Sequence, residues 1–207
     1  MRTITTQVFG FNELSDSAKE KAREWWRTDL PFDTEHIDAA DIAAMFGLDI
    51  RQTLKQRADK THHWMPSVYW SGFWSQGDGA SFDGTYVYKA GGLKAVKAHT
   101  LKDETLHRIV QRLQEVQRRY FYGLSARAKQ SGRYYHEMTV GVDVTETRYD
   151  REVKRDDEEE IIDCLRDFAR WIYRQLEAEY EYQNSDEVVD ETIIINEYEF
   201  DEDGNRV

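Results

Sequence analysis

Few side chains in this chain of 207 residues are spaced for catalysis or metal binding. Chelating histidine pairs usually sit three or four residues apart on a helix or two apart on a strand, and the six histidines show no such pair. Adjacent His62 and His63 point in different directions on regular structure. Cys164, the only cysteine, lies near Asp163 and Asp167, whereas a reactive thiol needs positive neighbours. We therefore expect a protein that is not an enzyme and holds no metal or cofactor.

The most distinctive stretch, 69–84, combines aromatic residues, glycines and small hydroxyl residues. Its alternation predicts one strand over 68–75 and a returning strand over 81–88. Aromatic residues fall on both faces of the first strand, which fits poorly with a strand that has one wet face. Between the strands, Gly77-Asp78-Gly79 predicts a tight turn, because glycine accepts the positive φ angles that such turns use.

Two interpretations of this predicted hairpin stay open. In the first, the aromatic residues belong to the core and the glycines serve the turn. In the second, an exposed rim contacts a partner, because aromatic side chains beside a rigid turn make good binding anchors. The candidate rim residues are Trp70, Trp74, Gln76, Asp78 and Ser81. A phosphate-binding loop is the weakest interpretation, because no Lys-Ser or Lys-Thr follows the glycines.

Three segments of the chain resemble one family of proteins. The first holds Phe11-Asn12-Glu13-Leu14-Ser15-Asp16, the second is GFWSQGDGASF at 72–82, and the third holds Asn196-Glu197-Tyr198-Glu199-Phe200 with Asp203-Gly204. They are similar to small acidic proteins of tailed phages and prophages, often labelled antitoxins of a toxin–antitoxin stability system. The resemblance implies a phage-encoded protein and supplies no catalytic residues. Segments 51–66 and 91–149 are longer than expected for that group and are candidate inserted or extended segments.

Charge is distributed unevenly in a chain whose net charge is −12. Residues 1–136 hold 20 Lys/Arg and 16 Asp/Glu, whereas 137–207 hold 8 Lys/Arg and 24 Asp/Glu. Five consecutive acids complement the macrodipole if they begin a helix. Alternatively, they dock on a basic or nucleic-acid-binding surface of a partner protein. These second candidate partner-binding residues are Asp156, Asp157, Glu158, Glu159 and Glu160.

Basic residues cluster over 108–133 with aromatic residues interleaved among them. Such a belt can hold single-stranded nucleic acid through charge and base stacking. It can equally neutralise the acidic third of the same chain, which is the interpretation we favour. The basic residues of this belt are Arg108, Arg112, Arg118, Arg119, Arg127, Lys129 and Arg133.

The remaining patterns predict a single α+β domain over 1–207, with an antiparallel-rich sheet and amphipathic helices packed mainly on one face. Ser15, Thr34, Thr100 and Ser185 are predicted helix caps, and Gly47 is a predicted helix stop. Strands are expected at 3–9, at 134–144 with Tyr134, His136 and Met138 on the buried stripe, and at 198–200. Segment 51–66 is interpreted as a flexible basic loop.

The sequence favours a phage-encoded binding protein that inhibits or neutralises a host protein by direct stoichiometric binding. A toxin or a defence complex such as a CRISPR effector fits this role. One alternative is a small enzyme or nucleotide-sequestering protein that uses hairpin 72–84, and another is a nucleic-acid binder that uses belt 108–133. With no run of about 18 apolar residues, no signal-like start and one cysteine, we expect a cytoplasmic protein without a membrane partner. The oligomeric state stays open.

Overall fold

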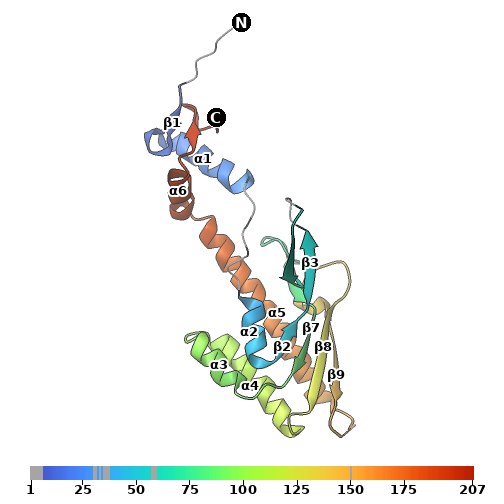
Figure 1. The fold of residues 1–207 in the computed structure, drawn as a ribbon. Helices are drawn as coiled ribbons and strands as arrows, with labels where there is room; N and C mark the ends of the chain where they lie inside the picture. Colours follow the sequence, from blue (N-terminus) through green and yellow to red (C-terminus); the bar gives the residue numbers. More distant parts are fainter. Residues whose placement is uncertain (1–6, 30–31, 33, 35–37, 57–59, 150) are drawn as a thin grey trace. The chain divides into compact units, whose positions relative to one another are not determined.

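The computed structural model describes residues 7–29, 32, 34, 38–56, 60–149 and 151–207 (Figure 1). Its contacts group into two compact units, which are 1–36 with 176–207 (unit 1) and 37–175 (unit 2). Helix α5, Arg155–Gln183, contributes residues to both units. This grouping does not test whether the chain folds as one domain, so the single domain stays a prediction. No helix in the described ranges is both long and apolar enough to cross a membrane.

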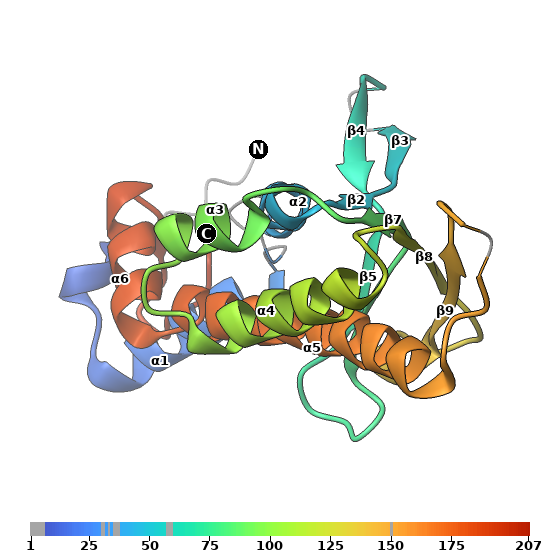
Figure 2. The same ribbon diagram turned by 90° about the horizontal axis from the view of Figure 1, so that it is seen from below.

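Unit 2 is built on a four-stranded antiparallel sheet in the order β2-β7-β8-β9. The strands are β2 Leu48–Ile50, β7 Gly84–Val87, β8 Leu124–Gln130 and β9 Val140–Glu146. Leu48, Tyr86 and Ala126 are buried on one face, whereas Thr85 and Arg127 are exposed on the other. Figures 1 and 2 show α2, α3 and α4 on the same side of this sheet. The predicted α+β class with an antiparallel-rich sheet is confirmed.

The helices of unit 2 are α2 Ala39–Phe46, α3 Gly92–His99, α4 Glu104–Arg119 and α5 up to residue 175. Gly47 ends α2 in the left-handed region (φ 95°), as predicted. Thr34 is not its cap, because Asp38 precedes the first helical residue. Thr100 follows α3, which the sequence did not predict, and Asp103 caps α4 by accepting the Leu106 N–H at 2.9 Å. The predicted cap Thr100 is therefore wrong, and the cap of α4 lies three residues later.

The strand predicted over 134–144 begins later than expected. Residues 137–139 form a short 3-10 helix, η2 Glu137–Thr139, and β9 starts at Val140. Tyr134 and Met138, expected on the buried stripe, are exposed. Strand β8, which pairs with both β7 and β9, was not predicted. Two of its three buried residues, Ala126 and Ala128, are small, so its hydrophobic alternation is weak.

Two further hairpins leave the main sheet. Strand β3 Gln52–Gln56 pairs with β4 His62–Pro66, so the predicted flexible loop over 51–66 is wrong for the residues that the structure describes. Strand β5 Val68–Ser71 pairs with β6 Gly79–Phe82. The predicted returning strand over 81–88 is divided in two, since β6 ends before Asp83 and β7 begins after it.

Three strand pairs meet at a junction formed by Arg51, Ser67 and Asp83. The N–H of Arg51 donates to the Asp83 carbonyl (2.9 Å), Asp83 donates to Ser67 (3.0 Å), and Ser67 donates to Arg51 (2.7 Å). The Asp83 carboxylate also accepts the Gln130 N–H at 2.8 Å and the Tyr69 hydroxyl at 3.3 Å. Where the strand pairs diverge, these backbone N–H and carbonyl groups have no partner within their own pair. The closed cycle of hydrogen bonds satisfies them. Pairs β3–β4 and β5–β6 extend from it in different directions (Figure 2).

Unit 1 contains β1 Phe9–Gly10 paired with β10 Glu199–Phe200, η1 Phe11–Glu13, α1 Asp16–Asp29 and α6 Asp186–Ile195. Ser15 and Ser185 accept the N–H groups of Ala18 and Val188, which confirms both predicted caps. Residues 3–6 of the predicted first strand lie outside the described residues. The core joins both ends of the sequence, and its residues are Phe11, Leu14, Ala18, Ala22, Val189, Ile193 and Phe200.

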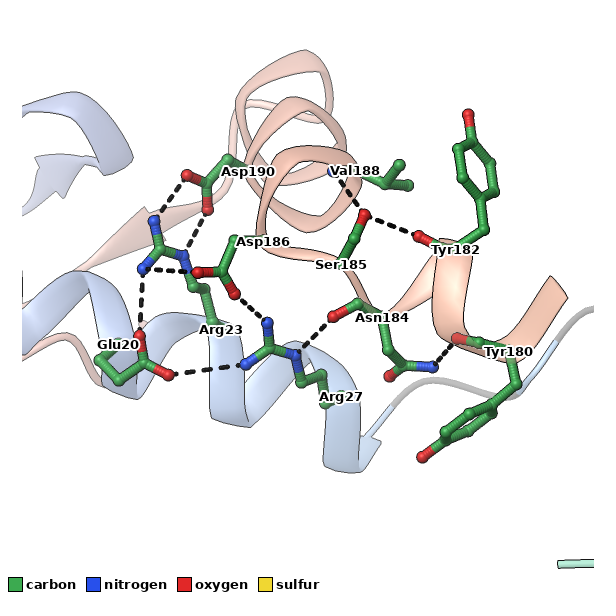
Figure 3. Close-up of polar contacts among 10 residues, drawn as sticks. All are labelled: Glu20, Arg23, Arg27, Tyr180, Tyr182, Asn184, Ser185, Asp186, Val188 and Asp190. Carbon is green, nitrogen blue, oxygen red and sulfur yellow. Dashed lines mark hydrogen bonds and ion pairs between the residues drawn. The ribbon is translucent and has the colours of Figure 1, made fainter. Parts of the chain in front are cut away.

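An arginine network ties α1 to α6 within unit 1 (Figure 3). Arg23 donates to both carboxylate oxygens of Asp190 at 2.7 Å, and the hydrogen bond to Asp190 raises the pKa of Arg23. Arg27 pairs with Asp186 and donates to the Asn184 carbonyl at 3.0 Å. The acids at the start of α6 are therefore balanced by arginines of the same unit.

Candidate partner-binding loop

Loop 72–78 connects β5 to β6 in unit 2 and contains most of the predicted rim. The tight turn predicted at Gly77-Asp78-Gly79 is wrong, because neither glycine has a positive φ angle. Gly79 is instead needed for close packing, since a Cβ there would lie 3.0 Å from the Cα of His136. The chain reverses through loop 72–78 instead, and the side chain of Asp78 fixes the shape of that loop.

Asp78 organises the loop from inside. Its Oδ2 accepts the N–H groups of Ser75 at 2.7 Å and Trp74 at 2.9 Å, while its own N–H donates to the Ser75 carbonyl at 3.0 Å. The backbone N–H groups of Ser75 and Trp74 lower the pKa of Asp78, because they stabilise the charged carboxylate. A Cβ at Gly72 would approach this oxygen to 2.7 Å, so the missing side chain leaves room for the carboxylate.

Aromatic packing fixes the underside of the loop. The Phe73 ring stacks on Trp70 with centroids 5.4 Å apart and lies 5.7 Å from Tyr173 of α5. The Tyr173 hydroxyl donates to the Gly72 carbonyl at 3.2 Å. The first residues of the loop are thus attached both to their own strand and to the long helix.

Trp74 and Gln76 lie on the outer side of this supported loop. Trp74 is 83% exposed, the most exposed of the large hydrophobic residues of the described chain. Gln76 is also exposed, whereas Trp70 and Asp78 are half-buried. Two of the five predicted rim residues therefore form an exposed surface, and Trp70 and Asp78 lie below it.

Ser81 does not belong to the rim, which corrects the prediction. It lies on β6 opposite Tyr69 and is completely buried. Phe82 beside it is also fully buried and packs edge-on against Phe168 of α5, with centroids 5.9 Å apart. The core interpretation of the hairpin is thus correct for β6. Trp74 and Gln76 have the exposure that the second interpretation requires, and their contact with a partner stays a prediction.

The acidic run 156–160 begins α5, as predicted, but much of it is used within unit 2. Asp157 is only 9% exposed, accepts the Tyr120 hydroxyl at 2.8 Å and pairs with Arg119 at 2.7 Å. Glu159 pairs with Arg155 at 2.8 Å and Glu160 with Arg112 at 2.7 Å. Asp157 is therefore no surface contact, because the end of α4 covers it, while Asp156 is exposed and Glu158 half-buried.

The basic belt 108–133 does not form one continuous surface. Arg112 pairs with Glu160 and with Asp167, both at 2.7 Å, and Arg119 pairs with Asp157. For these two arginines the predicted neutralisation of the acidic third is confirmed. Arg127 and Lys129 belong to β8 and are exposed on the face of the sheet opposite the buried one.

The remaining reactive residue types serve the fold. Cys164 is fully buried, and burial raises the pKa of its thiol to about 12. His136 accepts the Met138 N–H through Nδ1 at 3.2 Å and so caps η2. Among the described residues, no three His, Cys, Asp or Glu side chains come together where they could hold a metal ion.

Sequence reasoning missed the supports of the loop. The sequence pattern predicts Phe73 on a strand face. Tyr173 lies off the apolar stripe of α5, which consists of Ile161, Leu165, Phe168, Ile172 and Leu176. An aromatic residue off the stripe of an amphipathic helix was the available signal, since it indicates a second contact surface. Leu54 and Trp64 of β3 and β4 were also not recognised as an exposed pair.

Comparison with known proteins gives one match. A family described as "Domain of unknown function (DUF8835)" matches residues 32–186, which is more than half of the chain and includes all of unit 2. No curated protein and no solved structure matches the chain.

Proposed function

We propose that this chain, which belongs to the DUF8835 family of unknown function, acts by binding another protein stoichiometrically and thereby inhibiting it. The binding surface is loop 72–78, with Trp74 as its anchor and Gln76 beside it. The observation that carries the proposal is that Trp74 is 83% exposed on a loop whose backbone is hydrogen-bonded to Asp78 and Tyr173.

An exposed tryptophan on a supported loop is suited to binding. Tryptophan is among the residues that contribute most to protein interfaces when it fills a partner's pocket. Asp78 and the Phe73 stack hold the loop in one shape before binding, so little conformational entropy is lost on association. Asp78 acts here by positioning Trp74, and its contact with a partner is not required.

The partner class follows from the resemblance of segment 72–82 to proteins of tailed phages and prophages. A phage-encoded inhibitor meets proteins of the bacterial host, such as a toxin or a defence complex of the CRISPR type. Of the acidic run 156–160, Asp157, Glu159 and Glu160 are already paired with groups of the same chain. The affinity should therefore depend little on salt, in contrast to a complex steered by charge.

The test compares two exposed residues of unit 2. Tagged protein captures its partner from a host lysate treated with nuclease, and the variants Trp74→Ala and Leu101→Ala are captured in parallel. Leu101, which follows α3, is 79% exposed and serves as the matched control. We expect Trp74→Ala to lose a stoichiometric protein that Leu101→Ala retains. Retention of that protein by Trp74→Ala would show that another surface binds it.

One further variant with two substitutions distinguishes binding by loop 72–78 from binding by the acidic run 156–160. Combined charge reversal by Asp156→Lys and Glu158→Lys changes only acids outside the ion pairs described above. We expect this variant to retain the partner in both low and high salt. Loss of the partner in this variant alone would move the binding site to the start of α5.

A further inference from the structure

The β3–β4 arm, defined as residues 52–56 and 60–66, is a second exposed element of unit 2. Its two strands pair only with each other in the described part of the chain. All five residues of β3 are exposed, and so are His62 and Trp64 of β4. An isolated two-stranded hairpin is marginally stable in water, so this arm gains from a partner that covers it.

One face of the arm carries an apolar pair between polar neighbours. The register places Leu54 opposite Trp64, with Gln56 opposite His62 on the same face. Leu54 is 50% and Trp64 66% exposed. The flat indole surface is thus accessible, and the neighbouring amide and imidazole groups can form hydrogen bonds.

The charge of the arm is opposite to that of the protein. Lys55 and Lys60 of the arm are basic, as is Arg51 just before it, and none of the described residues of 51–66 is acidic, whereas the whole chain has a net charge of −12. Lys55 lies opposite His63 on the second face, and Lys60 stands at the end of the arm. The arm therefore carries positive charge at its end and on the face opposite Trp64, which points to an anionic ligand that contacts both faces.

We infer that the β3–β4 arm binds single-stranded nucleic acid. The indole of Trp64 stacks on a base, Lys60 at the end of the arm contacts one phosphate, and Lys55 contacts another where the strand passes around the edge of β3 to the second face. An exposed aromatic ring on an arm that also carries basic residues suits a single strand, whose unpaired bases present their faces. This function goes beyond the proposed protein inhibition and uses a different surface from Trp74 and from belt 108–133.

Fluorescence anisotropy with a labelled 20-nucleotide oligothymidine tests this inference. We expect binding at about 50 mM salt that weakens steeply at higher salt, because phosphate contacts release counterions. Trp64→Ala should lower the affinity about 10-fold or more, as expected for loss of one base stack. The double variant Lys55→Glu with Lys60→Glu should also lower it and reduce its dependence on salt.

Two controls separate this inference from the proposed function. Trp74→Ala and Leu101→Ala should leave oligothymidine binding unchanged, while Trp64→Ala should leave capture of the protein partner unchanged. Thermal unfolding of each variant shows whether the fold is intact. Failure of either proposal then leaves the other one standing.

Four outcomes would overturn the inference. They are absence of binding at about 50 mM salt, an affinity unchanged by Trp64→Ala, tighter binding of a duplex of the same length, and loss of binding only when Arg108 and Arg118 of the belt are reversed. Light scattering tests whether a second copy of this chain covers the β3–β4 arm. A dimer that dissociates in the lysine variant, without any nucleic-acid binding, would also contradict the inference.

Discussion

The β5–β6 pair, which ends in loop 72–78, and the β3–β4 arm both extend from the junction of Arg51, Ser67 and Asp83. Each presents an exposed tryptophan, but the packing beneath the two tryptophans differs. Trp74 follows Phe73, whose ring stacks on Trp70 and packs against Tyr173. The backbone N–H of Trp74 donates a hydrogen bond to the Asp78 carboxylate. Trp64 belongs to a hairpin that pairs only with itself in the described chain. Exposure alone therefore does not distinguish the two surfaces, and the support beneath each tryptophan does.

This difference predicts two kinds of binding. The supported loop loses little freedom when it enters a pocket, so it suits a defined protein surface. In the described residues the two strands of the arm pair only with each other, so the arm suits the flexible single strand that we propose as its ligand. Variants that change the support or the exposed residue separately can break or sharpen this comparison.

The largest expected contrast is between the two hairpins that leave the junction. Phe82→Ala should lower the free energy of unfolding by about 3–5 kcal/mol, because a fully buried ring is removed from its packing against Phe168. Trp64→Ala should change it by less than about 0.5 kcal/mol, because the ring is mostly in solvent. Chemical denaturation measures both. A large loss in Trp64→Ala would mean that the arm is a structural part of the core.

The junction itself should have an intermediate effect. Asp83→Ala removes the acceptor of the Gln130 N–H and of the Tyr69 hydroxyl. Leaving these groups without a partner should cost about 1–3 kcal/mol of unfolding free energy. The matched control is Asp143→Ala, an exposed acid on β9 of the same sheet. Equal stability of the two variants would show that the Asp83 carboxylate does not hold the junction together.

Lowering the pH is expected to have a smaller effect, which is confined to loop 72–78. The pKa of Asp78 is lowered in the folded protein, so its hydrogen bonds stabilise the loop above the ordinary carboxyl pKa of about 4. That contribution is lost as the pH falls through the lowered value. NMR titration should show the amide signals of Trp74 and Ser75 moving together in this acidic range, below the ordinary value.

The control for the titration is Asp78→Asn, in which no carboxylate titrates at this position. The joint movement of the two amide signals should disappear in that variant. A midpoint at or above the ordinary value in the unaltered protein would contradict the assigned hydrogen bonds. The arm offers the internal comparison, because the described residues 52–56 and 60–66 contain no carboxylate.

Local signals of the sequence were sufficient for some of the helix ends, although the predicted caps Thr34 and Thr100 were wrong. Ser15, Ser185 and Gly47 act where predicted, because a cap depends on a few neighbouring residues. The junction of Arg51, Ser67 and Asp83 was not predictable in this way. Its hydrogen bonds join backbone groups that are distant in sequence. Because every residue has the same backbone groups, the residue types do not indicate which of them pair.

The candidate site was predictable only in part for the same reason. Trp74 and Gln76 are exposed because they lie on a surface loop, which agrees with their place near the predicted turn. Ser81 and Asp157 were assigned to surfaces, but the residues that bury them come from other elements of the fold. Burial of a polar residue depends on tertiary neighbours, and its own sequence context does not reveal them.

The most direct test of the proposed function is site-specific photo-crosslinking in the bacterial host. A photoreactive phenylalanine analogue is placed at position 74 and, in a matched protein, at position 101. If loop 72–78 is the binding surface, one protein should be crosslinked from position 74 and not from position 101. No adduct from position 74, or the same adducts from both positions, would contradict the claim that Trp74 contacts a specific protein.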